Sequence, residues 1–130
     1  MQRIKKILIG THNKGKFKEI SYLLPQKTKK FSPDYFKIKS PKETGKSFQE
    51  NSLLKVKYFF KYSKMPSISD DSGLEVIALK KKPGIYSARW AKKYGSFKKA
   101  MEKILQLLSK KKIEKQFLFV VYQLNLIKKL

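Results

Sequence analysis

Residues 67–90 decide the fold, and they read Ser-Ile-Ser-Asp-Asp-Ser-Gly-Leu-Glu-Val-Ile-Ala-Leu-Lys-Lys-Lys-Pro-Gly-Ile-Tyr-Ser-Ala-Arg-Trp. A short strand runs into two adjacent carboxylates, Asp70 and Asp71, and Ser72-Gly73 is expected to turn the chain before a second strand at residues 74–79. The two acids therefore lie at a strand end, where α/β folds place ligand chemistry. Because adjacent anions repel each other, we expect them to share a cation.

The acid pair stands out because the chain is strongly basic. Its 130 residues contain 32 Lys or Arg against 9 Asp or Glu, for a net charge of +23. A surface of this kind suits a polyanion, such as a nucleic acid, a nucleotide or an anionic membrane face. The excess is mostly Lys and is spread over nearly every segment, so compositional drift or a plainly solvated surface is favoured over a specific binding surface.

Composition excludes several classes of protein and of site. A hydrophobic content of 41% fits one globular domain over residues 1–130. The absence of cysteine excludes disulfides and thiolate metal sites, and because His12 is the only histidine, any zinc site would need carboxylates instead. No apolar run reaches the length of a membrane span, and the run at residues 7–9 is too short for a signal peptide. We therefore expect a cytoplasmic protein with no membrane partner.

The N-terminal part reads as a strand, a polar turn and a helix. Residues 4–10 are the strand, and apolar residues at helical spacing lead to a stop at Pro25. The turn between them consists of Thr11, His12, Asn13, Lys14, Gly15 and Lys16. A helix N-terminus attracts anions, and Lys16 adds a charge where a phosphate would lie. The alternative is that Asn13 only caps the helix, since this is not a Walker A loop.

The middle of the chain supplies a second helix and one isolated acid. Phe36-Lys37-Ile38 reads as a short strand, and Glu43 follows in a lysine-rich loop, where by itself it favours pairing with a neighbouring lysine. A capping box at residues 47–50 starts a helix that should run to about Tyr62. Asn51 and Lys55 lie four apart on one face of this helix, which faces either a site or water.

The last part of the chain reads as one more helix and one more strand. Trp90 favours core packing, whereas Arg89 has two open roles, contacting an anion or bracing an aspartate. Ser96 is expected to cap an amphipathic helix, and a strand at residues 117–122 completes an α/β pattern.

Three segments, in order and spacing, resemble the inosine/xanthosine triphosphate pyrophosphatases, or Ham1-like family of non-canonical purine NTP pyrophosphatases. They are Thr11-x-Asn13-x-x-Lys16-x-x-Glu19, Glu43-Thr44-Gly45-x-Ser47-Phe48-x-Glu50-Asn51-x-x-x-Lys55, and Ser69-Asp70-Asp71-Ser72-Gly73-Leu74 with Pro83-Gly84-Ile85-Tyr86-Ser87-Ala88-Arg89. The resemblance runs from about residue 4 to about residue 122. It implies an elongated mixed α/β fold with a central cleft.

The resemblance also implies an enzyme and a substrate. Members hydrolyse ITP, dITP and XTP to the monophosphate and pyrophosphate, which cleanses the nucleotide pool. They need Mg²⁺ and usually form homodimers. This chemistry suits the residues, because splitting at the α-phosphate needs a water nucleophile, carboxylates for Mg²⁺ and cations for phosphate charge.

Roles for single residues follow from the resemblance. Asp71 matches the catalytic acid that activates water, and Glu43 and Asp71 match the metal-binding acids, with Asp70 beside them. The loop from Thr11 to Lys16 matches the triphosphate-binding loop. Lys55 matches a lysine that contacts phosphate, and Ser72 matches a substrate contact.

The chain also departs from the family pattern. Members continue with a Gly-Phe-Gly-Tyr-Asp-Pro segment, a substrate-binding lysine and a Ser-His-Arg motif, none of which this sequence contains. We therefore expect a C-terminally truncated, incomplete domain that keeps the phosphate and metal part and lacks base recognition. The strand at 117–122 would then be an exposed apolar edge.

Three functional hypotheses remain open. The first is an active pyrophosphatase, and the second is an impaired remnant that binds triphosphates without base selectivity. The third, ranked last, is a basic module for nucleic acid, whose binding would depend steeply on salt.

Overall fold

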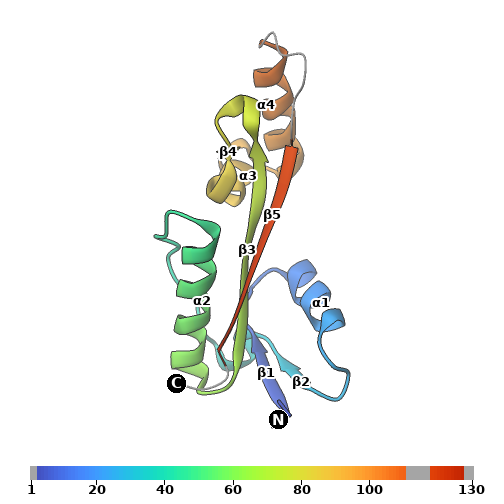
Figure 1. Ribbon diagram of the computed structural model, residues 1–130, viewed down its shortest axis with the longest axis vertical. Coiled ribbons are helices and arrows are strands. Elements are labelled where there is room, and N and C mark those ends of the chain that lie inside the picture. Colours follow the sequence, from blue (N-terminus) through green and yellow to red (C-terminus); the bar gives the residue numbers. More distant parts are fainter. Residues whose placement is uncertain (1–2, 111–117, 128–130) are drawn as a thin grey trace. The chain divides into compact units, whose positions relative to one another are not determined.

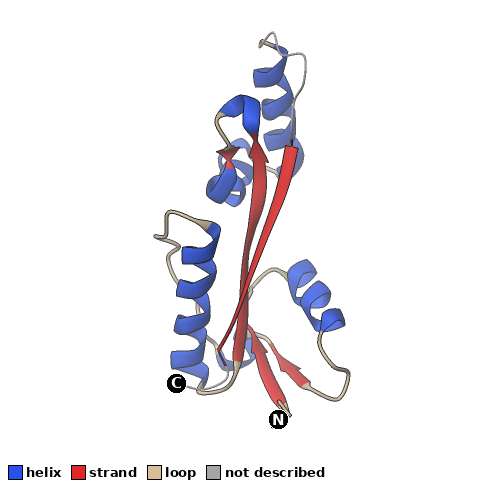
Figure 2. Cartoon of the chain, viewed as in Figure 1, coloured by secondary structure: helices blue, strands red, loops and turns tan. Residues whose placement is uncertain are grey.

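A computed structural model describes residues 3–110 and 118–127 and shows the expected mixed α/β fold (Figure 1, Figure 2). The strands are β1 (Lys6–Ile9), β2 (Lys29–Phe31), β3 (Ser67–Val76), β4 (Lys82–Pro83) and β5 (Leu118–Ile127). The helices are α1 (Lys14–Leu23), α2 (Phe48–Ser63), α3 (Ser87–Tyr94) and α4 (Phe97–Ser109). Short 3-10 helices cover Pro33–Phe36, Ile77–Leu79 and Gly84–Tyr86. No described helix is both long enough and apolar enough to span a membrane.

The strands form one sheet in the order β2-β1-β3-β4, and β5 pairs with β3. β1 is parallel to both of its neighbours, with Leu8 opposite Phe31 on one side and Ser67 on the other. β4 is antiparallel to β3, with Val76 opposite Lys82. The chain divides into two compact units, which are described separately below.

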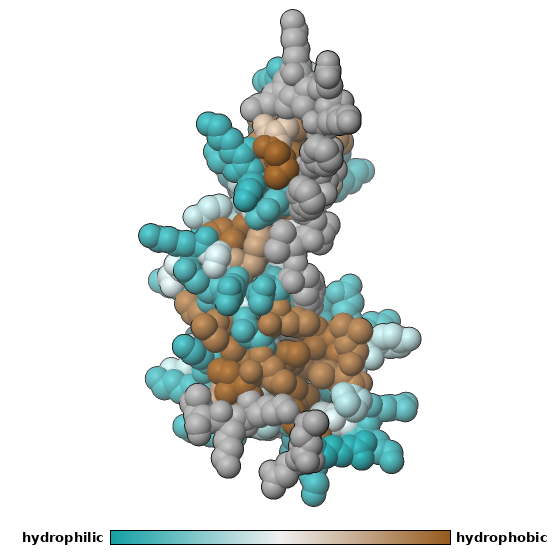
Figure 3. All heavy atoms as spheres, in the orientation of Figure 1, coloured by the Kyte–Doolittle hydropathy of each residue, from teal (hydrophilic) through white to brown (hydrophobic). Residues whose placement is uncertain are grey.

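The first unit contains the described residues of 1–71 and 123–130. Its core has two parts, because successive side chains of β1 point to opposite faces of the sheet. Ile7 and Ile9 pack with Ile20 of α1, whereas Leu8 packs with Phe59 of α2. Figure 1 accordingly shows α1 and α2 on opposite sides of these strands. The face seen in Figure 3 has hydrophobic residues gathered over this unit.

Both helices of the first unit start at the predicted caps. Asn13 caps α1 by accepting a hydrogen bond from the Lys16 N–H at 3.1 Å. Ser47 caps α2 through the Glu50 N–H, and the Glu50 carboxylate reaches back to the Lys46 N–H at 2.6 Å. The predicted helix is confirmed and ends at Ser63, one residue beyond the expected end.

The second unit contains the described residues of 72–122. Val76 and Leu79 pack against Ile104 and Leu108 of α4, with Trp90 beside them, so the core roles of Trp90 and of the amphipathic helix are confirmed. Arg89 lies over the ring of Tyr86, 4.9 Å from its centroid. The predicted apolar edge at 117–122 concerns side chains that lie outside the described residues.

Two local predictions were wrong. Ser72 and Gly73 do not turn the chain, because β3 continues through them to Val76 as one long strand that pairs with β5 and, at Glu75 and Val76, with β4. The expected strand at residues 36–38 is absent from the described chain, since Pro33–Phe36 forms a 3-10 helix that ends in a left-handed Lys37 with φ 56°. The edge strand lies earlier, at β2, where the adjacent Lys29 and Lys30 break the alternation of apolar and polar residues that is typical of a strand.

Candidate active site

The two adjacent acids of β3 lie on opposite faces of the strand. Asp70 and Asp71 are both buried, at 0% and 5% exposure. Asp70 pairs with Lys16 of α1, whereas Asp71 bonds to the side chain of Asn51 of α2. Alternation along a strand separates neighbours in this way. Lys16 also attracts the Asp71 carboxylate, so this lysine is a cation that acts on both acids, although only Asp70 forms an ion pair with it.

Asp70 depends on a single ion pair. Its Oδ2 lies 2.9 Å from the Lys16 Nζ, and within the described chain neither carboxylate oxygen has a hydrogen-bond partner. A buried carboxylate without hydrogen bonds is costly, so Lys16 supplies most of its compensation. This pair connects the first turn of α1 to the strand that carries Asp71.

Asp71 has the electrostatics of a base. Burial is the main cause that raises the pKa of its carboxyl to about 6, and repulsion from Glu43 adds to it. Attraction by Lys55, the hydrogen bond from Asn51 and attraction by Lys16 act in the opposite direction. The Asp71 carboxylate is therefore ionised at neutral pH but holds a proton far more readily than an exposed aspartate.

Glu43 and Lys55 lie next to Asp71. The Lys55 Nζ is 3.7 Å from the Glu43 Oε1, and Lys55 is 8% exposed although it is a lysine. The pairing of Glu43 with a lysine is thus confirmed, and its partner comes from α2. The structure brings Glu43, Lys55 and Asp71 together, and their roles in binding metal and phosphate stay predictions.

The turn between β1 and α1 is held by its own side chains. The Thr11 hydroxyl accepts a hydrogen bond from the Asn13 N–H at 3.1 Å, and Asn13 caps the helix. The first N–H groups of a helix have no partner within it, so the start of α1 at Lys14 and Gly15 suits an anion. Capping by Asn13 and anion binding are therefore compatible.

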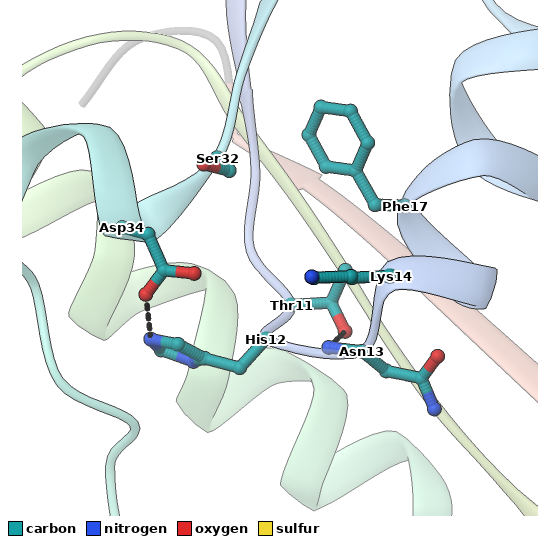
Figure 4. Close-up of a pocket in the computed structure, with 7 residues that line it drawn as sticks. All are labelled: Thr11, His12, Asn13, Lys14, Phe17, Ser32 and Asp34. Atoms are coloured by element: carbon teal, nitrogen blue, oxygen red, sulfur yellow. Dashed lines mark hydrogen bonds and ion pairs between the residues drawn. The ribbon is translucent and has the colours of Figure 1, made fainter.

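His12 has a different environment from the rest of the turn. Its Nε2 lies 2.9 Å from the Ile38 carbonyl and 3.6 Å from Asp34, and its Nδ1 lies 2.6 Å from the Ser40 hydroxyl. Figure 4 shows the ring pointing toward Asp34. The cavity drawn there has a volume of about 250 Å³ and is lined by Thr11, His12, Asn13, Lys14, Phe17, Ser32 and Asp34. His12 thus ties the turn to the segment at 34–40.

Among the described residues, no three His, Cys, Asp or Glu side chains gather closely enough to hold a metal ion by themselves. Mg²⁺ does not need such a cluster, because it keeps several waters and is bound by one or two carboxylates together with substrate phosphates. Glu43 and Asp71 repel each other, which a divalent cation would relieve. The donor set therefore fits Mg²⁺ that arrives with a phosphate ligand.

Sequence reasoning left two residues undecided or unplaced. Asn51 is 1% exposed and contacts Asp71, so its face of α2 is turned to the site and not to water. The signal was its spacing of four from Lys55. Ser72 belongs to the second unit and is half-buried, and its substrate contact stays a prediction.

These features define an α/β protein with a buried carboxylate, amide and lysine cluster and a helix N-terminus suited to phosphate. The chain belongs to the Ham1 family, whose model matches residues 7–127. The resemblance seen in the three motifs is thereby confirmed.

Similar proteins agree with this assignment. The chain is 45% identical over 105 residues to a dITP/XTP pyrophosphatase of Haemophilus influenzae, covering 80% of this chain and 54% of that protein. It is 43% identical over 107 residues to a dITP/XTP pyrophosphatase of Rhodopseudomonas palustris, covering 82% and 51%. The chain thus spans about half the length of these relatives.

Solved structures give the same fold. A HAM1 protein from Coxiella burnetii superposes with a TM-score of 0.86 at 27% identity, covering 96% of this chain and 64% of that one. A nucleoside-triphosphatase (dITP/XTP pyrophosphatase) from Mycobacterium abscessus has a TM-score of 0.77 at 31% identity, covering 95% and 65%. The predicted family fold is confirmed.

Proposed function

We propose that this chain carries the phosphate- and metal-binding part of a pyrophosphatase that hydrolyses ITP, dITP and XTP to the monophosphate and pyrophosphate. The observation that carries the proposal is the buried Asp71, with a pKa of about 6, beside Glu43 and Lys55. A carboxylate in this state suits acid–base work near neutral pH. The names of the relatives supply the substrate class.

The proton transfer is assigned to Asp71. Its carboxylate accepts a proton from a water molecule while the water oxygen bonds to the α-phosphorus. The bond from that phosphorus to the oxygen bridging the α- and β-phosphates then breaks, and pyrophosphate leaves with the bond electrons. The environment of Asp71 favours this role, because burial makes its protonated form accessible near neutral pH.

The cations of the site are assigned to the phosphates. Lys55 extends from α2 and is held beside Glu43. Lys16 and the N–H groups of Lys14 and Gly15 lie at the start of α1. The remaining residues of the loop, Thr11 to Asn13, shape this turn, and we keep them and Ser72 as substrate-binding residues. Charge on a triphosphate would thus meet cations from two helices.

Mg²⁺ is the proposed cofactor, with Glu43 and Asp71 as its protein ligands and Asp70 as the third candidate. When bound with substrate, the ion would neutralise phosphate charge and polarise the phosphoryl group. Asp70 is the weaker candidate, because it lies on the opposite face of β3 from Asp71 and Lys16 already compensates its charge there.

A phosphate-release assay tests the proposal. The chain is incubated with ITP, Mg²⁺ and an inorganic pyrophosphatase, and Asp71→Asn serves as the inactive control. We expect release that depends on both Mg²⁺ and Asp71, and turnover equal to that of the Asp71→Asn variant would contradict present activity. Binding of ITP and ATP with equal affinity, without turnover, would instead support the remnant without base selectivity.

Two further assignments come with this function. We place the protein in the cytoplasm, where the nucleotide pool is, and we propose that it works as a homodimer. Analytical ultracentrifugation of the purified chain tests the second assignment, and a monomer at micromolar concentration would contradict it.

A further inference from the structure

We propose that Asn51 is a positioning residue that fixes the separation of Glu43 and Asp71 and thereby sets the affinity of the site for a divalent cation. The proposal rests on the proposed function and adds to it a residue whose side chain binds neither the cation nor the substrate.

The side chain of Asn51 has two partners on different segments. Its Oδ1 accepts a hydrogen bond from the Gly45 N–H at 2.7 Å, and its side chain also bonds to Asp71. Asn51 is 1% exposed, and a buried amide in such a place needs its partners to offset lost hydration. One side chain therefore joins the loop of Glu43 to the strand of Asp71.

The contact with Gly45 also fixes which way the amide points. Since Oδ1 faces an N–H donor, the Nδ2 group is the one available to Asp71, and it donates to the carboxylate. An aspartate at position 51 would keep the acceptor for Gly45 but would lose this donor. The two bonds can thus be separated by a substitution that keeps the shape of the side chain.

The backbone around Asn51 is built for this close approach. A Cβ atom at Gly45 would lie 2.5 Å from the Asn51 Oδ1 and 2.8 Å from the Glu50 Cβ, so no side chain fits there. The first turn of α2 is fixed by the Ser47 cap. Glu43 precedes Gly45 by two residues, so the bond to Asn51 restrains the loop that carries it.

Lys55 restrains the same loop from the next turn of α2. Its Nζ lies 3.7 Å from Glu43, and a spacing of four places Lys55 on the same face of the helix as Asn51. Glu43 and Asp71 repel each other, so they would separate unless held. The amide between their two segments holds them in position without adding a charge.

The test measures metal binding by the whole chain. Mn²⁺ replaces Mg²⁺ as the probe, inorganic tripolyphosphate replaces the nucleotide, and electron paramagnetic resonance reports free Mn²⁺. We expect Asn51→Ala to weaken Mn²⁺ binding about 10-fold or more, as is usual when a residue that orients metal ligands is lost. Ser52→Ala is the matched control, because Ser52 is also buried on α2 but bonds to Gln49 and Asn125.

A second variant keeps the proposal testable if Asn51→Ala does not fold. In Asn51→Asp, the added negative charge by itself would strengthen cation binding, whereas loss of the donor to Asp71 sets two carboxylates against each other. We expect binding no tighter than that of the wild type. Tighter binding by Asn51→Asp, or equal binding by Asn51→Ala and Ser52→Ala, would overturn the role of Asn51.

The same experiment separates this inference from the proposed function. If the wild-type chain binds no Mn²⁺ in the presence of tripolyphosphate, both the metal site and the role of Asn51 are wrong. If the wild type binds and Asn51→Ala binds equally well, only the role of Asn51 is wrong.

Discussion

The Lys16 ammonium lies 2.9 Å from the carboxylate of Asp70, which is fully buried in β3. This pair gives the proposed phosphate loop a fixed attachment to the central sheet. It also explains how a chain with nine acids tolerates one at 0% exposure, since a cation at ion-pair distance comes from a helix packed on the same face.

Removal of Lys16 is expected to destabilise the fold. Lys16→Met leaves the Asp70 charge buried and unpaired, which costs about 3 kcal/mol in comparable cases. The double variant Lys16→Met with Asp70→Asn should recover most of that loss, because the buried charge is gone. Urea unfolding measures both, and Lys14→Met, an exposed lysine of the same turn, is the control. Equal losses for the two single lysine variants would contradict the prediction.

Substitution of Asp71 is expected to change stability in a way that depends on pH. The pKa of Asp71 is raised from 3.8 to about 6 in the folded chain, so folding favours the protonated form. The stability that this provides is present below pH 4 and is lost as the pH rises toward 6 and above. Asp71→Asn should therefore match the wild type near pH 4.

Above pH 6 the same variant should be more stable than the wild type by about 1–2 kcal/mol, because it removes a buried charge, and this is the usual size of a gain from one stabilising substitution. Thermal or urea unfolding at pH 4 and pH 7.5 gives the comparison. A variant that is less stable than the wild type at pH 7.5 would show that Asp71 is stabilised as an anion. Activity should be lost at both pH values, so stability and function move in opposite directions.

Gly45→Ala tests the close approach between the Glu43 loop and α2. The added methyl group would meet the Asn51 Oδ1 and the Glu50 Cβ, so the loop must shift away from the helix. We expect a loss of about 1–3 kcal/mol, as for other overpacked sites, measured by urea unfolding. Gly15→Ala is the comparison, since its methyl group would meet only the Asn13 Oδ1, at 3.2 Å. A neutral Gly45→Ala would mean that the loop is free to move.

The sequence contained enough information for the elements that carry strong local signals. The caps at Asn13 and Ser47 and the apolar stripe of α4 are local patterns, and the structure confirms each of them. The turn expected at Ser72 was wrong because Ser72 and Gly73 lie inside β3, a strand that pairs with three others along its length. Strand β2 was not predicted because its sequence, Lys29-Lys30-Phe31, lacks the alternation of apolar and polar residues that is typical of a strand.

The site was predictable in its residues but not in its arrangement. Asp70 and Asp71 were expected to act together. The structure shows that the Asp70 side chain points toward α1 and the Asp71 side chain toward α2. Whether Asn51 faces the site or water was undecided for the same reason, since the environment of a helix face depends on what packs against it. The spacing of residues along the chain identifies candidate site residues, and the structure shows which side chains they contact.

Mg²⁺ should stabilise the folded chain in a way that depends on pH and on Asp71. Metal ligands must be deprotonated, so a cation at Asp71 competes with the proton that this carboxyl retains up to about pH 6. With tripolyphosphate present, Mg²⁺ should raise the melting temperature more at pH 7.5 than at pH 5, since binding to the folded state shifts unfolding by mass action. Differential scanning fluorimetry with and without Mg²⁺ measures the shift. Asp71→Asn should lose the pH dependence, whereas Glu75→Gln, an acid of the second unit, should keep it. An equal shift at both pH values in the wild type would place the cation on groups other than Asp71.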